Sequence, residues 1–95
     1  MDLHELRMDL DRIDTDIVSL YEKRLKICEQ IAEYKISVGK PILDLAREQE
    51  KTREVRALCN NGRYAEKVES LYVKIMEDSR ELQSQYMKAK SERDR

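Results

Sequence analysis

The fold of this chain is decided by residues 2–38, which read DLHELRMDLDRIDTDIVSLYEKRLKICEQIAEYKISV. One stripe of positions in this segment alternates spacings of three and four residues, the heptad pattern of a helix that packs lengthwise on another helix. The stripe consists of Leu3, Leu6, Leu10, Ile13, Ile17, Leu20, Arg24, Ile27, Ile31, Tyr34 and Val38. All of these except Arg24 are apolar or aromatic, so the segment predicts one very long amino-terminal helix.

Boundary signals divide the chain into three helices. Asp2 with Glu5 three residues later resembles a capping box, and Gly39 followed by Pro41 ends the first helix. Asp44 is a good N-cap for the second helix. We expect a single domain over residues 1–95 with helices at about 2–38, 44–59 and 64–90, separated by turns at 39–41 and 60–62. The apolar pattern stops near residue 88, after which we expect the third helix to fray.

The composition agrees with an all-α fold and excludes several classes of protein. The 95 residues include only two Gly and one Pro, no Phe or Trp, and 41% charged side chains. Strand-forming residues are therefore sparse, whereas helix formers are abundant. A net charge of −1 and a pI of about 5.9 provide no basic surface for nucleic acid and no polybasic segment for a membrane. We expect neither kind of partner.

The cysteines and the histidine indicate no built-in metal site. Cys28 and Cys59 lie far apart, form no CxxC pair and follow no signal-peptide pattern, so we expect reduced thiols in a cytoplasmic protein. His4 is the single histidine. We therefore expect no metal and no cofactor.

No apolar run approaches the roughly 20 residues that a membrane span needs.

The length of the first helix predicts a homodimer. At 1.5 Å per residue it would measure about 55 Å, whereas a compact domain of this size is only about 32 Å across. Two shorter helices cannot cover a stripe of that length, and a long exposed apolar strip is a liability in a monomer. We therefore expect an intertwined homodimer in which the long helices of two copies pair.

Arg24 is the one cation within the apolar stripe. A guanidinium there is costly without an anion, although it could also set the register of a coiled coil or extend to the edge of the seam. Lys35 follows 11 residues later, about 20° away around the helix axis and about 16 Å along it, so both could reach one pocket. Arg7 is about 25 Å from Arg24 along the helix. It is either a solvated charge or, if the helices pair antiparallel, a contribution to the site of the second copy.

The other two helices also place polar residues on inward positions. In the second helix, Glu48 lies in the stripe expected to face the core, with Arg47 beside it and the amide groups capped by Asp44 at the same end. Glu48 could instead pair with Lys51 along the helix. In the third helix, Ser79 and Gln83 interrupt an apolar face. They could make a hydrogen bond between helices or contact a ligand.

These polar residues together suit a small dianion that carries a hydroxyl group. The inward cations exceed the single inward carboxylate of Glu48. The sequence offers no activated nucleophile, no histidine near this set and no Gly-rich phosphate loop. Such a site can bind, orient and stabilise charge, but it has no evident proton shuttle.

The residues resemble the all-helical AroQ-type chorismate mutases. The resemblance covers nearly the whole chain, in the order Leu6-Arg7, Arg24, Lys35, residues 41–48 and residues 77–83. It implies an intertwined dimer with two equivalent sites that convert chorismate to prephenate, the branch step toward phenylalanine and tyrosine. It also implies an isomerase that works by conformational and electrostatic stabilisation, without covalent catalysis and without a cofactor.

The resemblance further implies a role for each site residue. Arg24 and the Arg7 of the second copy would hold the carboxylate of the enolpyruvyl side chain. Lys35 and Gln83 would donate to the ether oxygen whose bond breaks, and Lys35 would also touch carboxylate. The implied catalytic residues are Lys35, Gln83, Arg24 and Glu48.

The same resemblance assigns the remaining contacts to the substrate ring. Glu48 and the backbone at Asp44 would hold the ring hydroxyl. Arg47 and Ser79 would serve the ring carboxylate and the edge of the pocket. Two alternatives stay open: an isochorismate pyruvate lyase, which resembles these mutases in fold and cationic pocket, and a non-catalytic helical dimerisation module with a register-setting Arg24.

Overall fold

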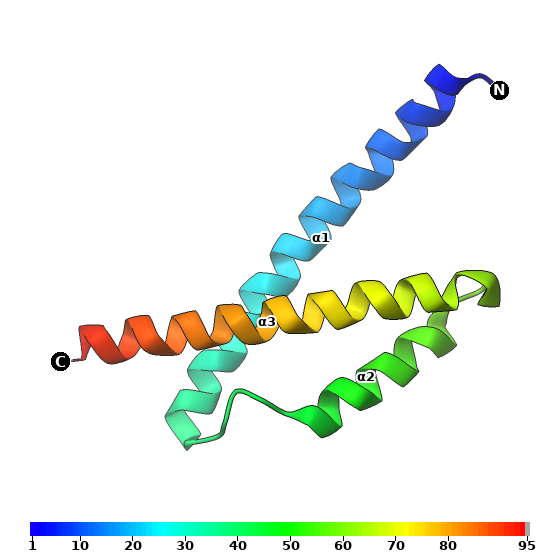
Figure 1. Cartoon of the computed structure of the whole chain (residues 1–95). Coiled ribbons are helices and arrows are strands. Elements are labelled where there is room, and N and C mark those ends of the chain that lie inside the picture. Colours follow the sequence, from blue (N-terminus) through cyan, green and yellow to red (C-terminus); the bar gives the residue numbers. More distant parts are fainter. Residues whose placement is uncertain (95) are drawn as a thin grey trace.

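The structure is a computed structural model that describes residues 1–94. Three α-helices and one short 3-10 helix follow one another along the chain (Figure 1). They are α1 (Leu3–Val38), α2 (Leu45–Leu58), η1 (Gly62–Tyr64) and α3 (Ala65–Arg93). Because residues 1–94 contain no strand, the prediction of an all-α fold with one very long amino-terminal helix is confirmed.

Both ends of α1 are fixed by local hydrogen bonds. The Asp2 carboxylate accepts from the backbone N–H of Glu5 at 2.9 Å, which satisfies one of the free amide groups of the first turn. At the other end Gly39 adopts φ 70°, a left-handed conformation that glycine reaches without a Cβ clash. Its N–H and that of Lys40 donate back to carbonyl groups of the last turn. The backbone is thereby turned toward α2.

The start of α2 is set by Asp44. Its carboxylate accepts from the backbone N–H of Arg47 at 3.0 Å, as expected of an N-cap. In the loop before it, the carbonyl of Ile42 accepts a hydrogen bond from the Lys35 ammonium at 2.8 Å. This bond ties the loop to α1, and it holds the first turn of α2 near the later half of the long helix.

The three helices form an open, elongated arrangement (Figure 1). α2 and the first half of α3 run side by side, whereas α1 crosses the second half of α3. The amino-terminal half of α1 projects beyond this crossing, and each of its residues up to Leu20 is exposed. The chain measures 59 × 26 × 14 Å and has a radius of gyration of 17.0 Å, well above the roughly 12 Å of a compact domain of this size.

The core of the single chain is small: most of it lies where α1 crosses α3, and Val55 and Ala65 are buried in α2 and at the start of α3. Ala32 is completely buried, and the small side chains of Ala32 and Cys28 let the two helices approach closely. Tyr21 donates a hydrogen bond to Asp78 at 2.9 Å beside this crossing. The buried side chains are Cys28, Ala32, Val55, Ala65, Met76, Ser79 and Gln83.

The apolar stripe of α1 is uncovered in the single chain. Each of its ten apolar or aromatic members is 41–63% exposed. α3 packs instead against the neighbouring face of α1 that contains Cys28 and Ala32.

No helix within residues 1–94 combines the length and apolarity needed to cross a bilayer.

The sequence expectation about the end of the third helix is wrong. The expected fraying after Lys88 is not seen, because α3 continues to Arg93, with Lys90 and Arg93 in the last turn where they complement the helix dipole. The last residue of that expected tail, residue 95, lies outside the described part. Leu45 and Leu71, apolar residues on α2 and α3, remain 60% and 56% exposed in the single chain.

Candidate functional site

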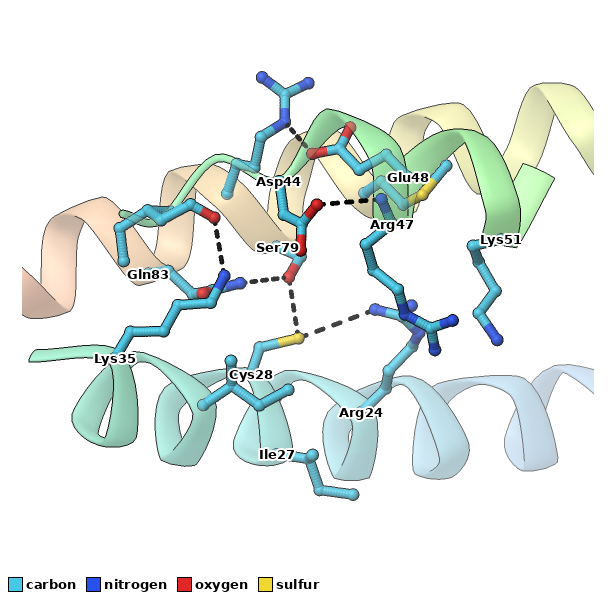
Figure 2. Close-up of a pocket in the computed structure, with 14 residues that line it drawn as sticks. Arg24, Ile27, Cys28, Lys35, Asp44, Arg47, Glu48, Lys51, Ser79 and Gln83 are labelled. Atoms are coloured by element: carbon cyan, nitrogen blue, oxygen red, sulfur yellow. Dashed lines mark hydrogen bonds and ion pairs between the residues drawn. The ribbon is translucent and has the colours of Figure 1, made fainter. Parts of the chain in front are cut away.

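A cavity of about 320 Å³ lies where the three helices meet (Figure 2). Its size is at the lower end of the range of small-ligand sites. α1 forms one wall, α3 another, and the loop before α2 together with the first two turns of α2 closes a third. The lining residues are Arg24, Ile27, Cys28, Ile31, Lys35, Ile42, Asp44, Arg47, Glu48, Lys51, Met76, Ser79, Arg80 and Gln83.

The cavity brings together seven of the eight site residues predicted from the sequence. They are Arg24, Lys35, Asp44, Arg47, Glu48, Ser79 and Gln83. The eighth, Arg7, lies in the exposed amino-terminal part of α1 and does not line the cavity of its own chain. Its distance from Arg24 along the helix is about 25 Å.

The two cations contributed by α1 have no carboxylate partner within residues 1–94. The Arg24 guanidinium lies 5.9 Å from the centre of the Tyr72 ring and donates a long hydrogen bond to the sulfur of Cys28 at 3.7 Å. The Lys35 ammonium donates to the Ile42 carbonyl and keeps two further N–H groups. Half-buried cations without a counter-ion attract an anion strongly.

The other three cations of the lining are already paired. Nη1 of Arg47 lies 3.4 Å from a carboxylate oxygen of Glu50, and Lys51 donates to Glu54 at 2.8 Å. This hydrogen bond from Lys51 is the main cause that holds the pKa of Glu54 below its ordinary value. The third, Arg80, pairs with Glu48, so Arg24 and Lys35 are the two cations of the lining that have no carboxylate partner among residues 1–94. The arrangement suits a ligand with two negative charges.

Glu48 pairs across helices and not along its own. Its Oε2 lies 2.9 Å from Nε of Arg80 in α3, and its side chain is 22% exposed. The alternative pairing of Glu48 with Lys51 is wrong, because Lys51 contacts Glu54. The carboxylate therefore stays at the cavity wall, where one oxygen remains able to accept a hydrogen bond.

Ser79 and Gln83 form a buried polar pair on α3. Nε2 of Gln83 donates to Oγ of Ser79 at 2.9 Å, and the Ser79 hydroxyl donates to the sulfur of Cys28 on α1 at 3.0 Å. The hydrogen bond between helices considered for this pair is therefore present. Oε1 of Gln83, however, is buried and has no hydrogen-bond partner among residues 1–94. An unsatisfied amide oxygen in a polar cavity marks a place where a ligand or water can bind.

Sequence reasoning missed three polar members of the lining. They are Cys28, Lys51 and Arg80. Helical spacing contains a signal for each, because Cys28 is four residues after Arg24, Lys51 is three after Glu48, and Arg80 is three before Gln83. The apolar lining residues Ile27, Ile31, Ile42 and Met76 were also not assigned to the site.

The family profile described as chorismate mutase type II matches residues 6–84. The chain belongs to the type II chorismate mutase family. The matched segment contains all eight predicted site residues and ends just after Gln83, so the last two turns of α3 lie outside it. The resemblance stated from the sequence, and with it the assignment to the chorismate mutases, a class of isomerases, is confirmed.

A curated relative agrees with this assignment. The protein named chorismate mutase from Methanocaldococcus jannaschii is 31% identical over 86 residues, which make up 90% of this chain and 87% of the relative. No solved structure matches the chain significantly. Among residues 1–94, no three His, Cys, Asp or Glu side chains are grouped so that they could hold a metal ion.

Proposed function

We propose that the chain rearranges chorismate to prephenate in the cavity between its three helices. The carrying observation is that Arg24 and Lys35, the two cations of the cavity lining without a carboxylate partner among residues 1–94, line one cavity with the Gln83 amide. A Claisen rearrangement is unimolecular, so it needs no nucleophile or proton transfer. The enzyme has to hold a compact conformer and stabilise electron density on the breaking ether bond.

The ether oxygen is assigned to Lys35 and Gln83. The ammonium uses one of its three N–H groups on the Ile42 carbonyl, and the amide nitrogen uses one of its two on Ser79. Both therefore retain a donor for an oxygen that gains negative charge in the transition state. Donors fixed before the reaction stabilise such charge without reorganising.

The enolpyruvyl carboxylate is assigned to Arg24. Its guanidinium is half-buried, is supported by the Tyr72 ring, and has no carboxylate to displace within residues 1–94. A guanidinium can bind carboxylate through two parallel hydrogen bonds and so fixes the side chain in one orientation. This orientation selects the compact conformer that reacts.

The substrate ring is assigned to residues of α2 and α3. Glu48 accepts a hydrogen bond from the ring hydroxyl. The free backbone amides near Asp44 donate to the oxygen of the same hydroxyl. Arg47 and Ser79 serve the ring carboxylate and the edge of the pocket. The Glu48–Arg80 pair supports this assignment because it holds the carboxylate at the wall of the cavity.

A homodimer completes each site. Two copies whose α1 helices pair antiparallel would bury the exposed stripe, and Arg7 of one copy would then lie beside the cavity of the other. The half-exposed apolar stripe and the projecting amino-terminal half of α1 support this proposal, because both leave apolar side chains open to a second copy (Figure 1). A cytoplasmic location remains a prediction of the same kind.

Incubation with chorismate tests the function directly. We expect prephenate, detected as phenylpyruvate after acid treatment, from the wild-type chain. Salicylate and pyruvate formed from isochorismate would instead support a lyase. A dimer that changes neither compound would leave only the dimerisation module and would overturn the proposal.

A further inference from the structure

The sulfur of Cys28 connects two walls of the cavity. Cys28 lies on α1, is 4% exposed, and accepts a hydrogen bond from the Ser79 hydroxyl of α3 at 3.0 Å (Figure 2). Arg24 donates to the same sulfur at the longer distance of 3.7 Å. A thiol is a weak acceptor, but it is the acceptor of the Ser79 proton here.

The direction of these hydrogen bonds orients the Gln83 amide. A serine hydroxyl has one hydrogen, and that of Ser79 is directed to Cys28. The oxygen of Ser79 is then left to accept, and it accepts from Nε2 of Gln83 at 2.9 Å. The amide nitrogen, not the amide oxygen, is therefore turned toward Ser79.

This orientation of the Gln83 amide leaves its oxygen without a protein partner among residues 1–94. The side chain is 6% exposed and lines the cavity, yet its Oε1 has no partner within residues 1–94. Rotation of the amide by 180° would let Oε1 accept from Ser79, but only if the Ser79 hydroxyl turned away from Cys28. In the orientation of the structure, Oε1 instead stays open to a ligand or water in the cavity.

We propose that Cys28 is a positioning residue for the rearrangement, which acts through Ser79 on Gln83 and rests on the proposed function. Its sulfur holds the Ser79 proton, Ser79 holds one hydrogen of Nε2, and the second hydrogen of Nε2 stays available to the ether oxygen of the substrate. Cys28 itself takes no part in bond making or breaking.

Steady-state kinetics with chorismate test this chain of hydrogen bonds. We expect Cys28→Ala to lower kcat roughly three- to tenfold, the effect of one weak hydrogen bond, with KM changed less than about twofold. The loss falls on kcat because charge grows on the ether oxygen only in the transition state. Cys28→Ser, whose hydroxyl can accept the same bond, should restore most of the rate. Cys59→Ser, outside the cavity, is the matched control and should leave kcat unchanged.

A double-mutant cycle separates positioning from packing. If Cys28 acts through Ser79, Cys28→Ala causes no further loss of kcat in a Ser79→Ala background. A wild-type kcat in Cys28→Ala, or an equal further loss in the Ser79→Ala background, would overturn the proposal. If Cys28→Ala fails to fold, Cys28→Val replaces it in each measurement, because valine fills the space without supplying an acceptor.

The side-chain amide signals of Gln83 give a readout that does not depend on activity. In a ¹⁵N–¹H spectrum, the Gln83 side-chain signals are assigned as those that disappear in Gln83→Glu. We expect these signals to shift in Cys28→Ala and to return toward their wild-type positions in Cys28→Ser. Signals that stay unchanged in Cys28→Ala would refute the relay even if the chain proved inactive on chorismate. Inactivity of the wild type would refute the proposed function alone.

Discussion

Oε2 of Glu48 in α2 lies 2.9 Å from Nε of Arg80 in α3, at the wall of the cavity. This pair joins two helices that also meet through Arg56 and Glu69, farther from the site. With Glu48 proposed to hold the substrate, we expect the first pair both to stabilise the fold and to position Glu48, whereas we expect the second pair only to stabilise the fold. The two arginines provide a matched comparison.

Arg80→Gln should weaken both the fold and substrate binding. Because the pair is partly exposed, the fold loses only about 0.5–1 kcal/mol, or about 2–6 °C in Tm. Glu48 also loses the partner that fixes its carboxylate, so KM for chorismate should rise several-fold. Arg56→Gln should lower Tm to a similar extent at unchanged KM. Equal KM values in the two variants would contradict a positioning role for Arg80.

Mixing two inactive variants should regenerate activity if sites are shared between copies. In a mixed dimer of Arg7→Ala and Arg24→Ala chains, one site has both mutations and the other has neither. After random exchange half of the dimers are mixed, so about a quarter of the wild-type activity should return. The measurement is the prephenate rate after subunit exchange has been verified by mass spectrometry. Activity that stays at the level of the separate variants would argue against an Arg7 contribution across the interface.

Gln83→Glu should be active only at low pH. The amide nitrogen of Gln83 is assigned as a donor to the ether oxygen, and a carboxyl group can donate only when it is protonated. The kcat of this variant should therefore rise as the pH falls, whereas Gln85→Glu, an exposed position on α3, should follow the wild-type profile. A Gln83→Glu variant that is more active at high pH would be incompatible with a donor role.

The Tyr21–Asp78 hydrogen bond should make stability depend on acid. The Tyr21 hydroxyl, and after it Lys74, lowers the pKa of Asp78 below its usual 3.8. A lowered pKa means that the Asp78 carboxylate stabilises the fold above about pH 3.8. This contribution is lost as the pH falls through the lower pKa that Asp78 has in the folded chain. Tyr21→Phe should therefore lower Tm at pH 7, and its difference from wild type should shrink as the pH is lowered below 3.8. The exposed Tyr64 supplies the control Tyr64→Phe; a Tyr21→Phe deficit that persists in acid would contradict this linkage.

The sequence was sufficient to predict the helices and the cations of α1. The ends of α1 follow from Asp2 and Gly39, whose capping chemistry is local. That Arg24 and Lys35 share a cavity follows from helical periodicity alone, because both lie on one rod. Local rules and the geometry of a single helix therefore carry over directly into the structure.

Contacts between helices could not be predicted in the same way. The Glu48–Arg80 pair depends on how far α2 and α3 slide past each other, which no spacing within either helix encodes. The face of α1 that packs against α3 could not be predicted either. It consists of the small side chains of Cys28 and Ala32, which lie beside a longer stripe of large apolar residues. Arg24 consequently lies at the border of two packing faces, not in the middle of one.

The kcat of Lys35→Ala on chorismate tests the central claim most directly, because Lys35 is assigned the charge on the breaking ether bond. Loss of one such donor costs about 2.7–4 kcal/mol, so kcat should fall by at least about 10²-fold while the helical signal and the dimer persist. Lys26→Ala, an exposed lysine on the same helix, should keep the wild-type rate. A Lys35→Ala variant with near-normal kcat would show that this cavity does not catalyse the rearrangement as assigned.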